Sequence, residues 1–266
     1  MRPLRFWGLY VLWFSLLSLL GANGQAQSLN GERAQPPALQ SNPLQTGAFT
    51  KEVRLADIVA AQDLAGMAHI YAAEQSLLWH IYVPPDYTPT KPAGLFVYIS
   101  PSTKADPPRP WRSVLAKKNY IYVSAGRAGN KVPANQRILN ALLAVQYMNA
   151  NYALDESRTL ISGFSGGARI ASIIVESAPG IFEEAVLMGG AIKSQTSLEA
   201  LGQKLEGGAY VFITGRKDQA RDEMKASYAQ YKKAGLTRLK FIDERNIGHE
   251  LPKSRILRRA LDFLSF

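Results

Sequence analysis

The sequence predicts a doubly wound α/β domain with a mostly parallel sheet that begins with antiparallel strands. From about residue 64 onward, short apolar runs alternate with segments of helical periodicity. The runs show little polar alternation, which is typical of strands buried on both faces of a parallel sheet. No segment repeats along the chain, so we expect one domain over about residues 53–266.

The antiparallel start is expected from two early strands, residues 67–73 and 77–84, joined by a tight turn at 74–76. The later strands are bounded by turn residues and are expected at 94–100, 120–126, 158–164, 184–191, 209–215 and 237–244.

Helices are expected between these strands. In residues 133–152, the apolar side chains of Ile138, Leu142 and Val145 recur at helical spacing. The other expected helices cover residues 110–119, 166–179, 197–205, 220–235 and 254–266. Only a short connection, residues 192–208, joins two late strands at the place where a cap domain would be inserted, so no large cap is expected.

The N-terminus is typical of a secretory signal peptide. Arg2 and Arg5 precede a near-continuous apolar run from Phe6 to Leu20, and the small residues Gly24 and Ala26 follow at cleavage-site spacing. The run is shorter than the roughly 20 residues that span a bilayer, so an uncleaved anchor is the less favoured alternative. We expect residues 1–26 to be removed, leaving a secreted or periplasmic protein with no stable membrane span.

Residues 27–52 are rich in Gln, Pro, Ser and Asn and have no apolar periodicity. This composition predicts a disordered or loosely attached leader.

Composition restricts the functional classes. The chain has 31 Lys and Arg against 21 Asp and Glu, a formal net charge of +10. No basic run with interleaved aromatics and no nucleic-acid module is present, so a basic solvated surface is favoured over nucleic-acid binding, with an acidic envelope surface as an alternative neighbour. The absence of cysteine excludes disulfides, thiolate metal sites and a cysteine nucleophile. Three histidines without metal-ligand spacing predict neither a metal nor a cofactor.

The segment RTLISGFSGG predicts a nucleophile at Ser165. A strand-like run ends at a sharp turn, and a helical run follows at once, so the serine hydroxyl is expected to project above the sheet. Gly163 and Gly167 would let the helix approach the strand closely, and Gly166 would leave its backbone N–H free for a substrate oxygen. By itself, the motif also fits a tight turn with a surface serine.

A nucleophilic serine needs a histidine as general base and a carboxylate to orient that histidine. His249 is the one histidine that follows Ser165, and it lies in the loop before the last helix. Asp218 follows an expected strand by three residues and is the favoured acid. Asp222 is the alternative, although we expect it to compensate the dipole of its own helix. Should neither serve, the next candidates are Asp243 and Glu244, while His69 and His80 are expected to be structural.

The oxyanion hole requires two backbone donors. Gly166 N–H is expected to be one of them. The other is expected from the loop after strand 94–100, from Ser102 or Thr103, since Pro101 has no N–H.

The loop after strand 120–126 supplies three candidate pocket residues, Arg127, Asn130 and Lys131, unless it is a solvated loop. Arg169, one turn into the helix after Ser165, is expected to be a structural hydrogen-bond donor.

The segment NYALDESRTLISGFSGGARIAS resembles the nucleophile region of secreted esterases of the polyhydroxybutyrate depolymerase and feruloyl esterase type. VFITGRKD and GHELP are similar to the acid and histidine segments of that group, and the resemblance covers about residues 77–266. It implies an α/β-hydrolase fold and a serine hydrolase that forms an acyl-enzyme on Ser165.

The substrate implied by the resemblance is a carboxylic ester, either a small molecule or a fragment of a polymer. The chain differs from many such depolymerases in having no cysteine and in its oxyanion loop, which lacks the His-Gly pair of many esterases. Two alternatives stay open: a peptidase or amidase with the same triad, and an envelope binding protein that uses the fold without catalysis.

Overall fold

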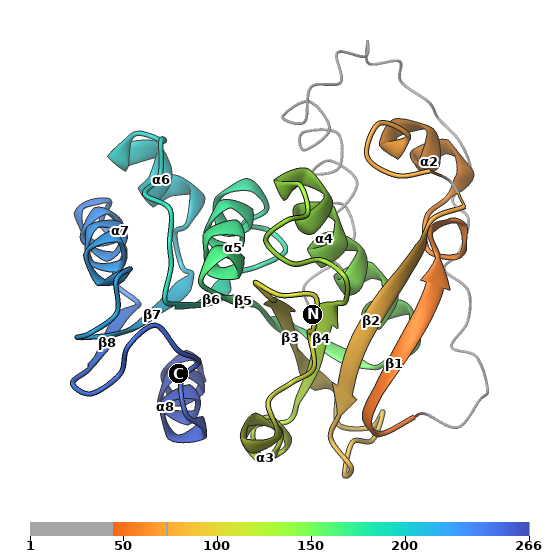
Figure 1. Ribbon diagram of the computed structural model, residues 1–266, viewed down its shortest axis with the longest axis horizontal. Helices are drawn as coiled ribbons and strands as arrows, with labels where there is room; N and C mark the ends of the chain where they lie inside the picture. Colours follow the sequence, from red (N-terminus) through yellow and green to blue (C-terminus); the bar gives the residue numbers. More distant parts are fainter. Residues whose placement is uncertain (1–44, 73, 266) are drawn as a thin grey trace, which may run out of the picture.

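The computed structural model describes residues 45–72 and 74–265, which form an eight-stranded sheet with the strand order β1-β2-β4-β3-β5-β6-β7-β8 (Figure 1). Strand β2 is antiparallel to β1 and β4, and all later neighbours pair in parallel. The strands are β1 (Gly47–Arg54), β2 (Ser76–Val83), β3 (Ala93–Ile99), β4 (Tyr120–Ala125), β5 (Leu154–Phe164), β6 (Glu184–Met188), β7 (Ala209–Gly215) and β8 (Leu239–Glu244). The predicted signal peptide and the first part of the predicted leader lie outside the described residues.

Helices cover both faces of the sheet (Figure 1). The larger apolar core lies between the sheet and α4 (Ala134–Asn151), α5 (Gly166–Ser177) and α7 (Arg221–Lys233). The smaller core lies on the opposite face, under α3 (Arg109–Lys117) and α8 (Ser254–Leu264). The remaining elements are the 3₁₀ helix η1 (Leu55–Asp57), α2 (Ala61–Met67) and α6 (Leu198–Lys204).

The apolar runs form the central strands as predicted. Every residue of β3, β6 and β7 is buried, because parallel strands with helices on both faces have no solvated side. In α8 the buried residues repeat at helical spacing and face the sheet, while the charged residues face solvent. The doubly wound α/β fold with antiparallel first strands is confirmed.

The expected strand at residues 67–73 is wrong. Met67 ends α2, and the backbone N–H groups of Ile70 and Tyr71 both donate to the Met67 carbonyl, at 2.8 and 2.9 Å. The three buried side chains of Met67, Ile70 and Tyr71 are spaced i, i+3, i+4, which is a helical pattern. Their spacing, rather than their apolar character, would have indicated the correct structure.

On its outer side β2 pairs antiparallel with β1, which lies partly within the predicted leader. Residues 47–52 are therefore ordered strand, and the domain begins before residue 53. Only Val53 of this strand is buried, because β1 is an edge strand with most of its side chains in solvent. An edge strand needs no apolar run, so composition did not reveal it.

No large cap interrupts the sheet. Between β6 and β7 the chain forms only α6, which packs against α7 so closely that a β-carbon on Gly202 would collide with the Ala234 carbonyl. Among the described helices, none combines the length and the apolar character that a membrane crossing requires.

Glu184, the first residue of β6, carries a titratable group in the core. Its side chain is buried, and one carboxylate oxygen has no hydrogen-bond partner. Burial raises its pKa to about 7, partly opposed by the charges of Arg238 and Arg158. Protonated Glu184 therefore stabilises the fold at low pH, and this stability is lost as pH rises from about 4.5 to about 7.

Glu184→Gln should remove this pH dependence. At pH 8 the variant should be more stable than wild type by on the order of 2–3 kcal/mol, since each pKa unit corresponds to about 1.4 kcal/mol. Urea denaturation at pH 5 and pH 8 measures the difference, with the exposed Glu206→Gln as the matched control. If Glu184→Gln and Glu206→Gln change the free energy of unfolding by the same amount at both pH values, ionisation of Glu184 does not cost stability.

Candidate active site

The turn between β5 and α5 holds Ser165 in a strained backbone conformation. Its φ and ψ are 53° and −122°, which non-glycine residues rarely adopt. A β-carbon on Gly163 would lie 2.7 Å from the backbone nitrogen of Ala168, and one on Gly167 would collide with the Ile99 carbonyl. Helix α5 thus packs directly on β5 and β3, as the flanking glycines predicted, and Ser165 is partly exposed above the sheet.

Two neighbouring loops at the same edge of the sheet supply the other polar groups. Asp218 follows β7, and His249 lies between β8 and α8. The loops are joined by a hydrogen bond from the Lys217 N–H to the Ile247 carbonyl, at 3.1 Å. A β-carbon on Gly215 would collide with that same carbonyl, so the close approach of the two loops requires glycine there.

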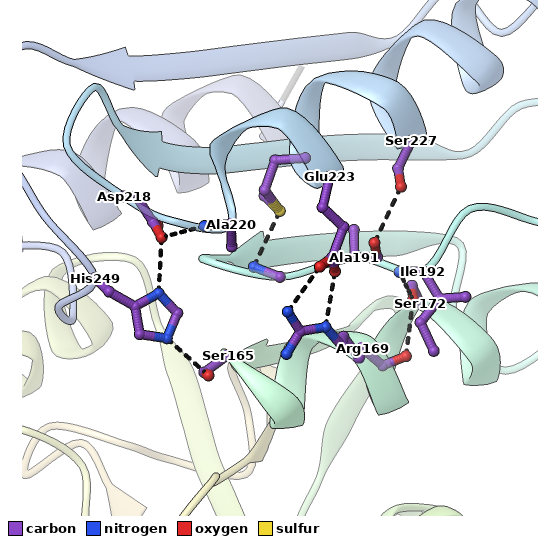
Figure 2. Close-up of polar contacts among 12 residues, drawn as sticks. Ser165, Arg169, Ser172, Ala191, Ile192, Asp218, Ala220, Glu223, Ser227 and His249 are labelled. Carbon is purple, nitrogen blue, oxygen red and sulfur yellow. Dashed lines mark hydrogen bonds and ion pairs between the residues drawn. The ribbon is translucent and has the colours of Figure 1, made fainter.

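Ser165, His249 and Asp218 form a continuous hydrogen-bonded chain (Figure 2). His249 Nε2 lies 2.8 Å from Ser165 Oγ, and His249 Nδ1 lies 2.8 Å from Asp218 Oδ1. An ionised carboxylate can only accept, so Nδ1 carries the proton and Nε2 is left to accept from the serine hydroxyl. The geometry is that of a nucleophile, a general base and an orienting acid.

The Asp218 carboxylate is held from several sides. Its side chain is only 2% exposed. Besides the histidine, Oδ1 accepts from the Ala220 N–H at 2.8 Å, and Oδ2 accepts from Thr214 Oγ1 at 3.2 Å. These donors satisfy a buried charge that would otherwise be costly, and they fix the oxygen that faces His249.

The alternative acids lie elsewhere. Asp222 is in the first turn of α7, where its charge complements the helix dipole as expected. Asp243 receives two hydrogen bonds from Arg221, and this guanidinium lowers the pKa of its carboxyl group. Glu244 pairs with Arg255 and Arg259. The structure therefore joins Asp218, and none of these three, to His249.

The loop after β6 forms the wall beside the serine. A β-carbon on Gly190 would lie 2.5 Å from the Ser165 carbonyl oxygen. Glu223 of α7 accepts two hydrogen bonds from Arg169 of α5, at 2.7 and 2.8 Å, and one from the Ala191 N–H at 2.9 Å (Figure 2). Arg169 is thus a structural hydrogen-bond donor, as expected, and the Arg169–Glu223 pair fixes this loop against the serine turn.

A buried cation that sequence reasoning missed lies beneath the site. Arg137 of α4 is 5% exposed and donates to the Ser100 carbonyl at 2.9 Å and to the Gly166 carbonyl at 3.4 Å. Burial lowers the pKa of this guanidinium. Arg137 links the end of β3 to Gly166, the residue after Ser165. An arginine directly before an apolar helix face was the signal available in the sequence.

The expected oxyanion donors are only partly supported. Gly166 begins α5, where its N–H has no partner within the helix. Ser102 N–H donates to Ser100 Oγ at 3.1 Å, so it is already engaged and the expectation for Ser102 is wrong. The Ser100 hydroxyl accepts this N–H within the loop, so the donor does not point to the site. The Thr103 carbonyl accepts from the Arg127 N–H at 3.1 Å, and no geometry assigns its own N–H to the site.

The three candidate pocket residues lie in different surroundings, and only Asn130 contacts the serine turn. The Arg127 guanidinium pairs with Glu52 of β1 at 3.2 Å, so it is engaged at the edge of the sheet. Asn130 lies against Gly166, the residue after Ser165. Lys131 follows it and is exposed.

The other histidines are not part of the hydrogen-bonded chain. His69 is exposed in the turn after α2, and His80 lies in β2 with its Nδ1 3.0 Å from Asp106 Oδ1. Within the part of the chain that the structure describes, no three His, Cys, Asp or Glu side chains gather as metal ligands would.

Solved structures similar to this chain include several esterases. Esterase 2 of Thermogutta terrifontis aligns with a TM-score of 0.56 at 16% identity, covering 85% of this chain and 96% of its own. A ferulic acid esterase aligns with a TM-score of 0.61 at 12% identity, covering 84% and 99%. The chain has the α/β-hydrolase fold.

A third structure with this hydrolase fold is a Bacteroides ovatus protein assigned as a dipeptidyl aminopeptidase IV. It aligns with a TM-score of 0.59 at 15% identity over 81% of this chain, which spans only 35% of that protein. No protein-family model and no curated protein matches the chain in sequence. At such identities the likeness establishes the hydrolase fold, and the chemistry has to be argued from the site.

Gly189 tests how closely the loop after β6 supports the site. It has φ +58°, and a β-carbon there would lie 2.9 Å from Phe164, 3.2 Å from Asp218 Oδ2 and 3.4 Å from His249 Cε1. Gly207 has φ +77° but no described atom within 4 Å of its β-carbon position, so it is a matched control.

Both Gly189→Ala and Gly207→Ala should lose about 1–2 kcal/mol of stability to backbone strain. If the hydrogen-bonded chain is catalytic, only Gly189→Ala should also lower kcat, by up to about 10²-fold, because it displaces these groups. Melting temperature and ester turnover of the two variants measure this, and equal turnover would show that the loop does not position the site.

Proposed function

We propose that this protein is a serine hydrolase that cleaves carboxylic esters through an acyl-enzyme on Ser165. The observation that carries the proposal is the chain of hydrogen bonds from Asp218 through His249 to Ser165, located at the carboxyl ends of the parallel strands. Ligands and reactive groups in open α/β sheets gather at this edge. The partial exposure of Ser165 and His249 leaves both within reach of a substrate.

The reaction follows from the positions of the protons. His249 Nε2 takes the Ser165 hydroxyl proton as Oγ attacks the ester carbonyl carbon, and the carbonyl electron pair moves onto its oxygen. Gly166 N–H stabilises this oxyanion. The imidazolium, stabilised by Asp218, then gives its proton to the departing alcohol. Water repeats the sequence on the acyl-enzyme and releases the carboxylic acid.

Esters are the favoured substrate class for two reasons. The two esterases described above align over nearly their whole length, whereas the aminopeptidase is matched only over a third of its chain. Among the described residues, only α6 lies between β6 and β7, and an uncapped site of this kind is compatible with an ester attached to a polymer. The fold and the triad would serve a peptidase equally, so the substrate must be separated by experiment.

A fluorophosphonate probe tests for an activated serine independently of the substrate. Wild-type protein should be labelled, and Ser165→Ala should not. If folded wild-type protein is not labelled at neutral pH, the site is not catalytic, and a binding role for the hydrolase fold takes its place.

A substrate panel then separates the two enzyme classes. Short p-nitrophenyl esters and peptide p-nitroanilides both release a coloured nitroaromatic product, but the ester has the better leaving group, so the diagnostic result is whether the anilide is cleaved at all. We expect turnover of the esters and no measurable turnover of the anilides. Cleavage of a peptide anilide would identify a peptidase instead.

We further propose that the protein is exported, on the strength of the charged, apolar and small-residue regions of residues 1–26. Expression in a bacterial host should yield an extracytoplasmic protein whose mass corresponds to cleavage near Ala26. Retention in the cytoplasm with the N-terminal segment intact would contradict export.

A further inference from the structure

The site as described holds only one assigned donor for the oxyanion. Gly166 N–H is available, but the Ser102 N–H expected to assist it is bonded to Ser100 Oγ. A tetrahedral oxyanion is normally stabilised by at least two donors, and loss of one costs about 10²–10³ in kcat. A second donor is therefore expected beside Gly166.

Asn130, in the loop between β4 and α4, places its carboxamide directly against Gly166. A β-carbon on Gly166 would lie 2.7 Å from Asn130 Cγ and 2.8 Å from Nδ2, and it would collide with Oδ1. A side chain at position 166 would therefore displace the Asn130 carboxamide.

The spacing of the two donors suits a shared oxygen. A backbone nitrogen lies about 2.5 Å from its own β-carbon position, so Gly166 N and Asn130 Nδ2 are separated by at most about 5.3 Å. Two donors that each lie about 2.9 Å from one oxygen can be up to about 5.8 Å apart. The separation of the two nitrogens is therefore compatible with donation to one oxyanion.

The backbone of Asn130 is fixed, but its carboxamide is free. Its N–H donates to the Pro101 carbonyl at 2.9 Å, and the neighbouring Gly129 packs against Ser102, where a β-carbon would lie 2.8 Å from the carbonyl carbon. Among the described residues, none forms a hydrogen bond with the Asn130 carboxamide, and the residue is exposed. Either amide orientation is accessible, and an oxyanion selects the one that presents Nδ2–H.

We propose that the Asn130 carboxamide is the second oxyanion donor, together with Gly166 N–H. This inference rests on the proposed serine hydrolase function. As Ser165 Oγ bonds to the carbonyl carbon, the carbonyl π electrons move onto oxygen, and Asn130 Nδ2–H donates to the negative charge that forms. The hydrogen bond strengthens with that charge, so the residue acts on kcat more than on substrate binding.

Replacing Asn130 with Asp tests the donor with almost no change in shape. Asn130→Asp should lower kcat for a p-nitrophenyl ester by about 10²–10³-fold with KM changed less than about threefold. Asn130→Ala should show a similar loss, and it removes the added negative charge as an explanation. Asn135→Asp makes the same substitution at the start of α4, away from the hydrogen-bonded chain, and should keep wild-type turnover.

A trifluoromethyl ketone separates a catalytic role from a structural one. Its hemiketal with Ser165 carries an oxyanion, so its inhibition constant should rise in parallel with the loss of kcat/KM across the wild type and both Asn130 variants. Unchanged melting temperatures are expected for all three proteins.

The competing results are distinct. Suppose that the wild type is labelled and active and that the Asn130 variants keep kcat within about threefold of it. Such a change is far smaller than the loss of an oxyanion donor, so this result would overturn the Asn130 proposal alone. A wild type that is folded but unlabelled would overturn the hydrolase proposal and this one with it.

Discussion

Asp218→Asn is expected to lower kcat by about 10⁴-fold while the protein still folds. The asparagine keeps the shape of the carboxylate, but its amide group can donate to His249 Nδ1. The imidazole would then carry its proton on Nε2 and could no longer accept from Ser165 Oγ, which lies 2.8 Å away. Turnover of a p-nitrophenyl ester and the melting temperature of the purified variant measure the two effects separately.

Asp222→Asn is the control for this substitution. Asp222 lies in the first turn of α7, so its loss should cost only about 0.3–1 kcal/mol of stability and little rate. A large loss of turnover in Asp222→Asn with near-normal Asp218→Asn would transfer the acid to Asp222. Near-normal turnover in both would leave the histidine without a required acid.

Ser165→Ala and His249→Ala should each lower kcat by about 10⁶-fold, and the double variant should be no slower than either single one. The two side chains act in one proton transfer, so removing either removes the whole step. Single-turnover and steady-state rates on the same ester, with circular dichroism to verify folding, measure the non-additivity.

Additive losses in this cycle would mean that Ser165 and His249 contribute independently. Ser165→Ala with substantial turnover would place the nucleophile elsewhere. The double variant also measures the background from oxyanion donors and substrate binding alone, which is the reference for the effect of Asn130.

The central sheet was predictable because burial on both faces demands uninterrupted apolar runs, and these runs can be read directly from β3 to β7. The first strands were harder. β1 lies at an edge with one buried residue, so nothing in its composition distinguishes it from a leader. The strand expected at residues 67–73 is wrong because the buried side chains of Met67, Ile70 and Tyr71 have helical spacing, which apolar content alone does not distinguish from a strand.

The triad residues were predictable because chain order restricts them. His249 is the one histidine that follows Ser165, and Asp218 lies three residues beyond the end of β7. The structure brings all three side chains together. Their catalytic roles stay predictions. The oxyanion donors could not be predicted in the same way, because they depend on the hydrogen bonds within the loop after β3. There the Ser100 hydroxyl accepts from the Ser102 N–H, a contact that no sequence pattern indicates. Asn130 and Arg137 precede Gly166 by 36 and 29 residues, so only the folded chain reveals that both contact it.

The position of His249 has a consequence for how the enzyme would fail on heating. Its loop follows β8, an edge strand that pairs only with β7 and buries only Ile242. Edge elements with few buried contacts open locally at a lower free energy than the whole domain. Amide hydrogen exchange should therefore be faster in β8 than in β5 or β6, and activity should be lost at temperatures where the central sheet is intact. Thermal inactivation would then report fraying of one strand rather than melting of the domain.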